Sequence, residues 1–298
     1  MSTTAIEHAI ESVECELTDK CNLTCDHCCT NSSPQAAAPT MTPEDWHRVI
    51  NDTASLGIPT IQFIGGEATL DRHLPDYIGH ALDRRLRVEV FSNLKVVQPR
   101  MWRAFQQPGV QLAVSYYSDQ ADQHDVVTNG PGSHKLTRAN IVKALAYGIP
   151  MRAAVVKVNE GQRVDEAADD LRSLGISRIR IDRTRKVGRA ADQTLAVPDV
   201  SELCGHCFRA RISVSPDGNV NGCILSPWLI AGNVREQGLA NILRSPRVAE
   251  LAATIPMPVR GQGCPPDDSS DCSPANTTAC DPKYDFAPLA DTALGARA

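Results

Sequence analysis

The sequence predicts an α/β fold: a partial (β/α)6 barrel of parallel strands with a small C-terminal cysteine-rich hairpin domain. Three observations lead to this expectation. Short apolar runs alternate with longer segments of helical periodicity over the first two thirds of the chain. Polar motifs directly follow several of the apolar runs. In the last third, a Pro-Asp-Gly turn separates two β-prone segments and has cysteines on either side.

Six apolar runs are predicted strands, because each is short and is followed by a polar loop. They are Ser12–Leu17, Thr60–Ile64, Arg87–Phe91, Val110–Tyr116, Pro150–Lys157 and Ser177–Asp182. Alternation of such strands with helices predicts a parallel sheet with right-handed crossovers. Six units form an open partial barrel rather than a closed barrel of eight, and reactive groups lie at the carboxyl ends of the strands in such folds.

Two helices carry clear terminal signals. In Thr42–Asp45 the threonine is a predicted N-cap, the proline fits the first turn and the aspartate completes a capping box, and Gly57 ends this helix. Ser133 is predicted to open a second helix that runs through Tyr147 and is closed by Gly148.

The composition is that of an ordinary globular protein, with 42% hydrophobic and 22% charged residues. A net charge of -5 argues against nucleic acid as a partner, because phosphate binding needs a basic face. No apolar run approaches the length of a membrane span, and Met1–Glu11 lacks the features of a signal peptide. We therefore expect a cytoplasmic protein that binds neither nucleic acid nor membrane.

Cysteine is over-represented, with 11 residues of which none lies between Cys29 and Cys204. Disulfides are disfavoured, because cytosolic thiols stay reduced and an odd total leaves one thiol unpaired. Metal ligation is the better interpretation of a reduced chain with many cysteines.

Cys21, Cys25 and Cys28 form the pattern Cys-x3-Cys-x2-Cys. Structural zinc sites normally use four ligands on two paired turns, so zinc is the less favoured alternative. Three thiolates on one loop leave one iron of a 4Fe–4S cluster open to a small molecule. S-adenosylmethionine can chelate that iron through its amino and carboxylate groups.

With this spacing the sequence resembles the radical SAM enzymes, over about residues 12–286. The resemblance implies a 4Fe–4S cluster and S-adenosylmethionine as cofactors, with an external one-electron reductant such as flavodoxin. It also implies that a 5′-deoxyadenosyl radical removes a hydrogen atom from an unactivated C–H bond of the substrate.

The resemblance assigns cofactor contacts to polar residues at the ends of strands. The glycine-glycine-glutamate turn after the second strand corresponds to the family's contact with the methionyl amino group. A serine-asparagine pair after the third strand resembles a ribose contact, and a serine near the end of the fourth resembles a carboxylate contact; ordinary strand-end turns are the alternative. These residues are Gly65, Gly66, Glu67, Ser92, Asn93 and Ser115.

One position departs from the family. Related enzymes often carry an arginine three residues after a His-Asp pair, where it can hold the carboxylate of S-adenosylmethionine. In this chain the pair is His124-Asp125, and the residue three positions later is Thr128. Another residue must therefore hold that carboxylate. His27, beside Cys28, occupies a place often taken by an aromatic side chain over the adenine, and a solvated loop histidine is the alternative.

Beyond Val187 the alternating pattern stops, and a polar bridge leads to three cysteines around the predicted hairpin. The spacing of Cys207, Gly218 and Cys223 resembles the auxiliary-cluster hairpin of SPASM and twitch domains. The resemblance implies at least one auxiliary 4Fe–4S cluster on Cys204, Cys207 and Cys223 with a fourth thiol. A zinc site on the same residues is the alternative.

Cys264, Cys272 and Cys280 depart from the spacing of a full SPASM domain. One of them can complete the auxiliary cluster, which leaves two thiols unassigned, and one of the three is a candidate hydrogen donor. We expect a radical SAM core in residues 1–187, a SPASM/twitch-like domain in 188–286 and a tail in 287–298.

Two substrate classes fit the resemblance. One is ribosomal peptides, which receive a crosslink, a thioether or an epimerised centre. Only 20 residues precede Cys21, which we expect to be too few for the leader-binding domain of many such enzymes. The other is antibiotic sugars and aminocyclitols, on which enzymes such as neomycin C epimerase act.

The unassigned thiols favour epimerisation of an aminoglycoside-type substrate, because epimerisation is redox neutral and a cysteine S–H can quench the radical. Peptide modification, or dehydrogenation of a sugar or aminocyclitol with the auxiliary cluster as electron acceptor, is the alternative. A non-enzymatic iron–sulfur or zinc-binding regulator is a further one.

Overall fold

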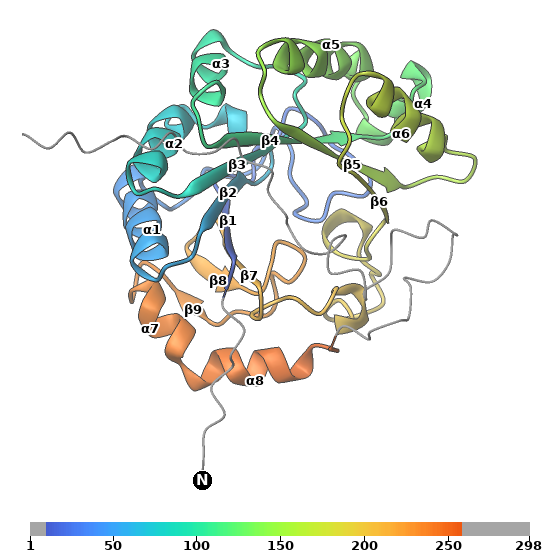
Figure 1. The fold of residues 1–298 in the computed structure, drawn as a ribbon. Helices are drawn as coiled ribbons and strands as arrows, with labels where there is room; N and C mark the ends of the chain where they lie inside the picture. Colours follow the sequence, from blue (N-terminus) through green and yellow to red (C-terminus); the bar gives the residue numbers. More distant parts are fainter. Residues whose placement is uncertain (1–9, 258–298) are drawn as a thin grey trace, which may run out of the picture.

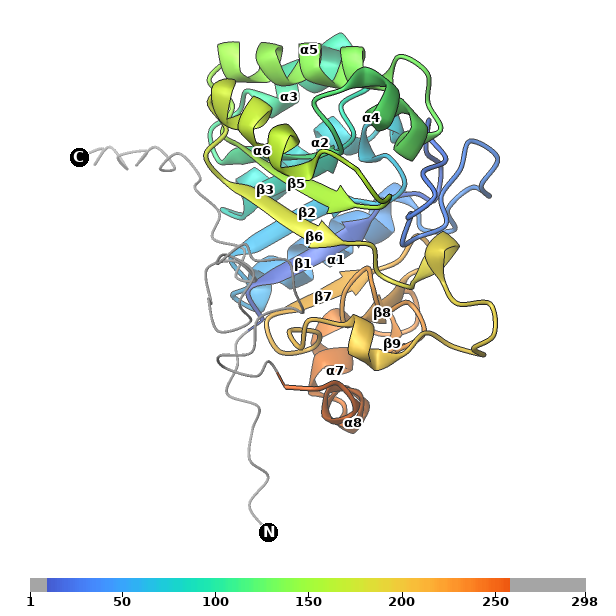
Figure 2. The ribbon, with the colours of Figure 1, turned by 90° about the vertical axis from the view of Figure 1, so that its right-hand side faces the viewer.

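The computed structural model describes residues 10–257, in which nine strands form one sheet in the order β6-β5-β4-β3-β2-β1-β7-β8-β9. The six strands of the barrel are β1 (Ser12–Glu16), β2 (Thr60–Ile64), β3 (Arg87–Ser92), β4 (Val110–Tyr116), β5 (Met151–Lys157) and β6 (Ile179–Arg183). All neighbouring pairs among them are parallel, which confirms the predicted partial barrel. Their arrowheads point toward the side on which the loop after β1 lies (Figure 2).

Helices cover the outer face of this sheet (Figure 1). They are α1 (Pro43–Ser55), α2 (Leu74–Asp83), α3 (Pro99–Phe105), α4 (Ala121–Thr128), α5 (Ser133–Ala146) and α6 (Val164–Ser173). Side chains alternate along each strand. On β1, Val13 and Cys15 are fully buried in the hydrophobic core, whereas Glu14 and Glu16 face the inside of the barrel.

The predicted start of α1 is confirmed, because the Thr42 hydroxyl accepts from the backbone N–H of Asp45 and the Asp45 carboxylate accepts from that of Thr42. At α5 the cap differs from the prediction. Ser133 is the first residue of α5, as predicted. The N-terminus of this helix is capped by the side chain of Asp125, which accepts from the backbone N–H groups of Gly132 and His134. The carboxylate of the His-Asp pair thus joins α4 to α5.

The predicted hairpin is formed by β7 (Arg211–Val214) and β8 (Asn219–Asn221), which are antiparallel. β7 also pairs in parallel with β1, so the hairpin continues the barrel sheet, which the sequence did not reveal. β9 (Gly232–Asn233) follows, and then α7 (Leu239–Arg244) and α8 (Pro246–Thr254). β6 and β9 lie at opposite ends of the sheet, which is therefore an open partial barrel.

A buried ion pair crosses the inside of the barrel. Glu89 on β3 is fully buried and accepts from both Nε and Nη2 of Arg152 on β5, at 2.8 and 2.7 Å. The side-chain amides of Gln62 and Gln111 donate to the same carboxylate. Burial alone would raise the pKa of Glu89, but Arg152 and the two amides lower it below its ordinary value. The pair therefore ties β2, β3, β4 and β5 together.

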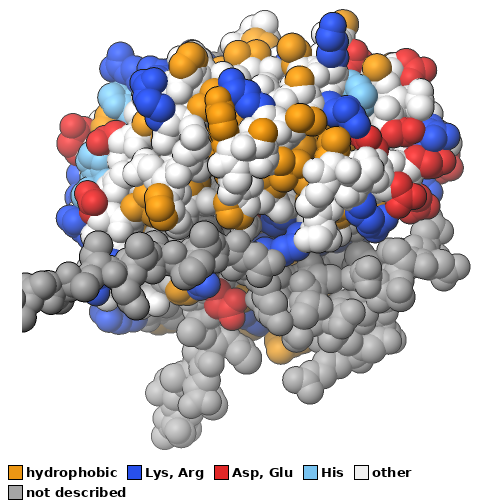
Figure 3. All heavy atoms as spheres, turned by 45° about the horizontal axis from the view of Figure 1, so that its top comes forward, with side chains coloured by type: hydrophobic (Ala, Val, Ile, Leu, Met, Phe, Trp, Pro, Cys, Tyr) orange, Lys and Arg blue, Asp and Glu red, His pale blue; other side chains and the backbone are white. Residues whose placement is uncertain are grey.

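No helix within residues 10–257 has the length and apolar character needed to cross a membrane. The face that carries the helices outside β3, β4 and β5 mixes hydrophobic side chains with both signs of charge (Figure 3). Leu136, Val142 and Tyr147 are among the exposed hydrophobic residues on this side of the chain.

Candidate functional site

Cys21, Cys25 and Cys28 lie on one loop after β1, which we call the cysteine loop (residues 18–33). Its two ends are joined, since Lys20 and Ser33 form an isolated β-bridge and the backbone N–H of Cys21 donates to the carbonyl of Ser33 at 3.1 Å. The three sulfurs are thus presented by a closed loop at the carboxyl end of the barrel, where the sequence placed them.

Donors from the protein already point at two of these sulfurs. The backbone N–H of Ser32 donates to Cys28 Sγ at 3.3 Å, and Asn93 Nδ2 lies 3.8 Å from Cys21 Sγ. Burial raises the pKa of Cys21 and of Cys25 to about 12, and the neighbouring sulfurs add to the shift. A bound metal cluster supplies the positive charge that favours the thiolate form. Three thiols with donors to sulfur fit an iron–sulfur cluster.

Within residues 10–257, no three Cys, His, Asp or Glu side chains converge on a site for a single metal ion. A cubane differs in this respect, because each of its thiolate ligands binds a separate iron. The role of Cys21, Cys25 and Cys28 as cluster ligands stays a prediction.

The glycines after β2 pack directly on the cysteine loop. A Cβ atom on Gly65, whose φ is +130°, would lie 2.6 Å from the Thr18 carbonyl oxygen, and one on Gly66 would lie 2.3 Å from that of Lys20. The backbone N–H of Glu67 donates to the Lys20 carbonyl at 2.9 Å. The absence of side chains on these glycines thus lets the turn after β2 pack closely against the backbone of the cysteine loop. Their contact with a methionyl amino group stays a prediction.

Glu67 joins this turn to the end of β3. Its buried carboxylate accepts from Ser92 Oγ at 2.7 Å and from the backbone N–H of Asn93 at 2.8 Å. Burial raises its pKa above the ordinary value, although these bonds and those from Thr69 oppose the shift. Asn93 Nδ2 in turn donates to Asn22 Oδ1 at 2.8 Å, on the cysteine loop. The predicted ribose pair is therefore beside the loop, and its contact with ribose stays a prediction.

His27 packs edge-on against Tyr117, with their ring centroids 4.9 Å apart. Burial lowers the pKa of His27 to about 4, so the ring is neutral at physiological pH. Tyr117 is itself buried, and its hydroxyl lies near the side chain of Ser115. Tyr117 therefore joins the predicted carboxylate contact to the cysteine loop. Sequence analysis missed it, although it follows the fourth predicted strand directly.

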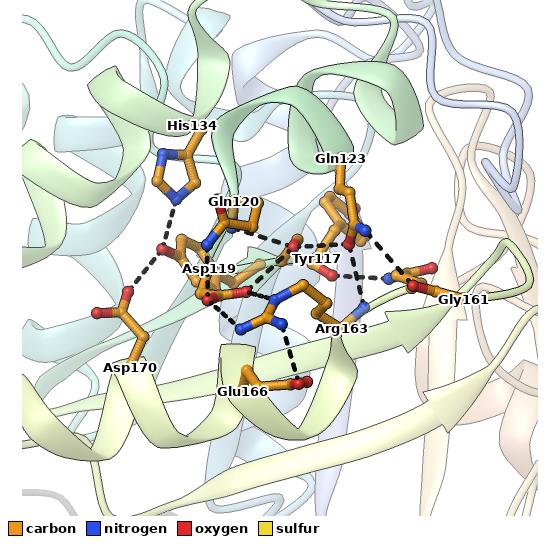
Figure 4. Close-up of polar contacts among 12 residues, drawn as sticks. Tyr117, Asp119, Gln120, Gln123, His134, Gly161, Arg163, Glu166 and Asp170 are labelled. Carbon is orange, nitrogen blue, oxygen red and sulfur yellow. Dashed lines mark hydrogen bonds and ion pairs between the residues drawn. The ribbon is translucent and has the colours of Figure 1, made fainter.

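A polar network holds the loops beyond Tyr117 (Figure 4). Arg163 Nε and Nη2 donate to the two carboxylate oxygens of Asp119, both at 2.9 Å, and the hydrogen bond from Arg163 lowers the pKa of Asp119 to about 2. Gln162 Nε2 donates to the Tyr117 carbonyl at 2.7 Å. The loop between β4 and α4 is thereby fixed to the one between β5 and α6, and both border the site.

Arg189 is the other residue that sequence analysis missed. It lies in the predicted bridge after β6, yet its guanidinium donates to the carbonyls of Cys25 and Ser32. A Cβ on the preceding Gly188 would lie 2.4 Å from the Cys28 carbonyl oxygen. Residues 188–189 therefore clamp the cysteine loop.

The hairpin brings together two of the three predicted auxiliary ligands. Cys207 and Cys223 are buried, and their sulfurs lie 3.1 Å apart as free thiols. The contact with Cys207, together with burial, raises the pKa of Cys223 well above its ordinary value. Cys204 is half-buried, and Cys264, Cys272 and Cys280 lie outside the described residues.

Residues 15–171 match the radical SAM superfamily, and residues 204–273 match SPASM, an iron–sulfur cluster-binding domain. The chain belongs to the radical SAM superfamily. Its radical SAM domain implies a 4Fe–4S cluster and S-adenosylmethionine, and its SPASM domain implies auxiliary iron–sulfur clusters. The family predicted from the cysteine spacing is thus confirmed, together with its cofactors.

Three curated relatives are similar to this radical SAM chain. The PqqA peptide cyclase of Xanthomonas campestris is 24% identical over 85% of this chain and 79% of its own length. AlbA, the antilisterial bacteriocin subtilosin biosynthesis protein of Bacillus subtilis, is 22% identical over 79% of this chain and 60% of its own length. The AdoMet-dependent heme synthase of Methanosarcina barkeri is 30% identical over 46% of this chain, which covers only 40% of that protein.

Among solved structures, Streptococcus suis SuiB bound to S-adenosylmethionine superposes with a TM-score of 0.69 at 11% identity, over 82% of this chain and 68% of SuiB. This likeness concerns the fold. It agrees with the open parallel barrel and the C-terminal extension that the structure shows.

Proposed function

We propose that this radical SAM enzyme modifies a ribosomally made peptide, with Cys21, Cys25 and Cys28 as ligands of the cluster that binds S-adenosylmethionine. The observation that carries the proposal is the breadth of two matches. The PqqA peptide cyclase of X. campestris and AlbA cover 85% and 79% of this chain, through both the barrel and the hairpin, whereas the heme synthase covers 46%.

The bound cluster and S-adenosylmethionine supply one-electron chemistry that starts a radical reaction. The described residues position that chemistry. Glu67, Asn93 and Arg189 fix the cysteine loop to β2, β3 and the segment after β6. A loop held from three sides keeps the reacting atoms in line, which is the main contribution a protein makes to such a step.

Two buried polar groups of the sheet differ in their hydrogen bonds. The Glu89 carboxylate is bonded to Arg152 and two amides. The buried side-chain oxygen of Asn221 on β8 has no hydrogen-bond partner in the described part of the chain. A peptide N–H satisfies such an acceptor. We therefore place the substrate between the cysteine loop and the hairpin.

Two further features suit a peptide. The sheet is not closed between β6 and β9, and we propose that a peptide enters the barrel at this side. Cys207 and Cys223 lie at the hairpin that adjoins β1, and we propose that with Cys204 and a fourth thiol they hold an auxiliary cluster on the substrate's other side.

The deciding experiment compares labelled probes. The full chain, reconstituted with iron and sulfide without oxygen, is incubated with S-adenosylmethionine, dithionite and either synthetic peptides with perdeuterated side chains or deuterated neomycin-type aminoglycosides. We expect deuterium to enter 5′-deoxyadenosine from peptides. Transfer from the aminoglycosides alone would instead establish the substrate class predicted from the sequence. Absence of transfer from every peptide would reject the proposal.

Two variants make a matched control for this experiment. Cys21→Ala removes a proposed cluster ligand and should abolish cleavage of S-adenosylmethionine. Cys15→Ala removes a thiol on β1 that is buried in the hydrophobic core, and this variant should still cleave S-adenosylmethionine. Epimerisation, and the hydrogen-donor role of Cys264, Cys272 or Cys280, stay predictions.

A further inference from the structure

Lys95 carries a charge that no neighbouring residue neutralises. It lies in the turn after β3, where its backbone N–H donates to Asn93 Oδ1 at 2.8 Å. Its side chain is half-buried, and its ammonium group has no hydrogen-bond or ion-pair partner within residues 10–257. An ammonium group without a partner in the protein can pair with an anion from outside it.

The ammonium group lies beside the cysteine loop. A Cβ atom built on Gly130 would be 3.5 Å from Lys95 Nζ, 3.4 Å from Thr128 Oγ1 and 2.4 Å from a methyl carbon of Leu23. Leu23 stands between Cys21 and Cys25 on the loop. Lys95 Nζ, Thr128 Oγ1 and the Leu23 side chain thus all lie around Gly130, next to the proposed cluster ligands.

The carboxylates near this volume are already engaged. Asp26 accepts from Asn129 Nδ2 at 2.7 Å, and Asp125 caps α5. Glu67 is saturated by Ser92, Thr69 and Asn93, as described above. The cation Arg189, which borders the loop, is occupied by backbone carbonyls. Lys95 differs from all of these groups in being available to an anionic ligand.

The methionyl end of S-adenosylmethionine is an amino acid, so it brings a carboxylate to the cysteine loop. We propose that Lys95 binds this carboxylate. An ammonium–carboxylate hydrogen bond is charge-assisted and stronger than a neutral one. The assignment also fits the threonine at position 128, since Lys95 lies near this position, at which related enzymes often carry an arginine. The proposed role of Lys95 requires only that the protein binds S-adenosylmethionine, and it does not depend on the class of substrate.

The test measures cofactor binding rather than turnover. The full chain, reconstituted without oxygen, is titrated calorimetrically with S-adenosylmethionine and with decarboxylated S-adenosylmethionine, which lacks only the carboxylate. We expect Lys95→Met to weaken binding of the first ligand about tenfold or more, as loss of a charged hydrogen bond implies. Binding of the decarboxylated ligand should be unchanged, and Lys95→Arg should restore most of the affinity.

Lys135→Met is the matched control, because Lys135 is exposed on α5 and its loss should change neither affinity. Calorimetry reports affinity per loaded site, so partial loss of iron in a variant does not obscure the result, and Lys95→Gln provides a second neutral side chain. Equal weakening of both ligands by Lys95→Met and Lys95→Gln, or affinities within twofold of the parent, would overturn the proposal.

Discussion

The backbone N–H of Arg189 donates to the carbonyl of Cys28 across 2.8 Å, although 160 residues separate them along the chain. Together with the guanidinium bonds to Cys25 and Ser32, this contact makes the segment after β6 part of the cysteine loop's support. The region that matches the radical SAM superfamily ends at residue 171, so the loop depends on chain beyond that region.

Arg189→Ala should therefore weaken retention of the cluster. The variant leaves two partly buried carbonyls without their charged donor, which costs about 1.5–3 kcal/mol of loop stability. We expect a lower iron content after reconstitution and at least severalfold faster loss of iron to a chelator, followed by absorbance. Arg172→Ala is the control, since Arg172 is exposed and, among the residues that the structure describes, pairs only with Asp169 on the same helix. Equal rates for the two variants would contradict the clamp.

Two glycines offer a test of packing at the turn after β2. A Cβ on Gly66 would lie 2.3 Å from the Lys20 carbonyl oxygen, whereas one on Gly79, inside α2, meets nothing within 4 Å. Gly66→Ala should lower the free energy of unfolding by about 1–3 kcal/mol. Gly79→Ala should raise it by about 0.5–1 kcal/mol, because alanine has the higher helix propensity. Urea denaturation of the cluster-free protein measures both, and a stable Gly66→Ala protein would show that the turn can shift.

The strands of the barrel could be predicted from the sequence because each has a local signature. Thr60–Ile64 and Val110–Tyr116 were predicted with the observed bounds, since a short apolar run between polar loops has few other structures. The helix start at Thr42 was predictable for the same reason, because a capping box is local in sequence.

The supports of the site could not be predicted in this way. Arg189 and Lys95 have no motif, and their positions beside the cysteine loop follow from long-range contacts of the folded chain. The pairing of β7 with β1 is also a long-range contact, so the hairpin was predicted without its place in the sheet. The cysteine spacing revealed the cofactor, because three ligands on one loop are local in the chain.

The ion pair inside the barrel should be important for stability. Arg152→Met leaves the fully buried Glu89 without its cation, and breaking a buried pair in this way costs about 3–5 kcal/mol. Adding Glu89→Gln should recover much of that loss, because the uncompensated charge is gone. Chemical denaturation of the two single variants and the double variant gives the coupling between the residues. Additive effects would show that the two side chains do not act as a pair.

Glu16 predicts a pH dependence of stability. Burial and the nearby carboxylates of Glu14 and Asp19 raise the pKa of Glu16 from 4.5 to about 8. The folded protein therefore binds more protons than the unfolded chain between these two values, so the contribution of Glu16 to stability is present below about pH 4.5 and is lost as the pH rises toward 8.

Glu16→Gln should remove this contribution, because the amide stays neutral. The free energy of unfolding of the cluster-free variant is compared with that of the parent by urea denaturation with a thiol reductant. This difference should be more favourable to the variant at pH 8.5 than at pH 5, by on the order of a few kcal/mol. Glu250→Gln, at an exposed glutamate on α8, should shift stability equally at both pH values. A Glu16→Gln protein whose stability follows the pH curve of the parent would mean that Glu16 is already ionised in the folded state, with water or a cation reaching the inside of the barrel.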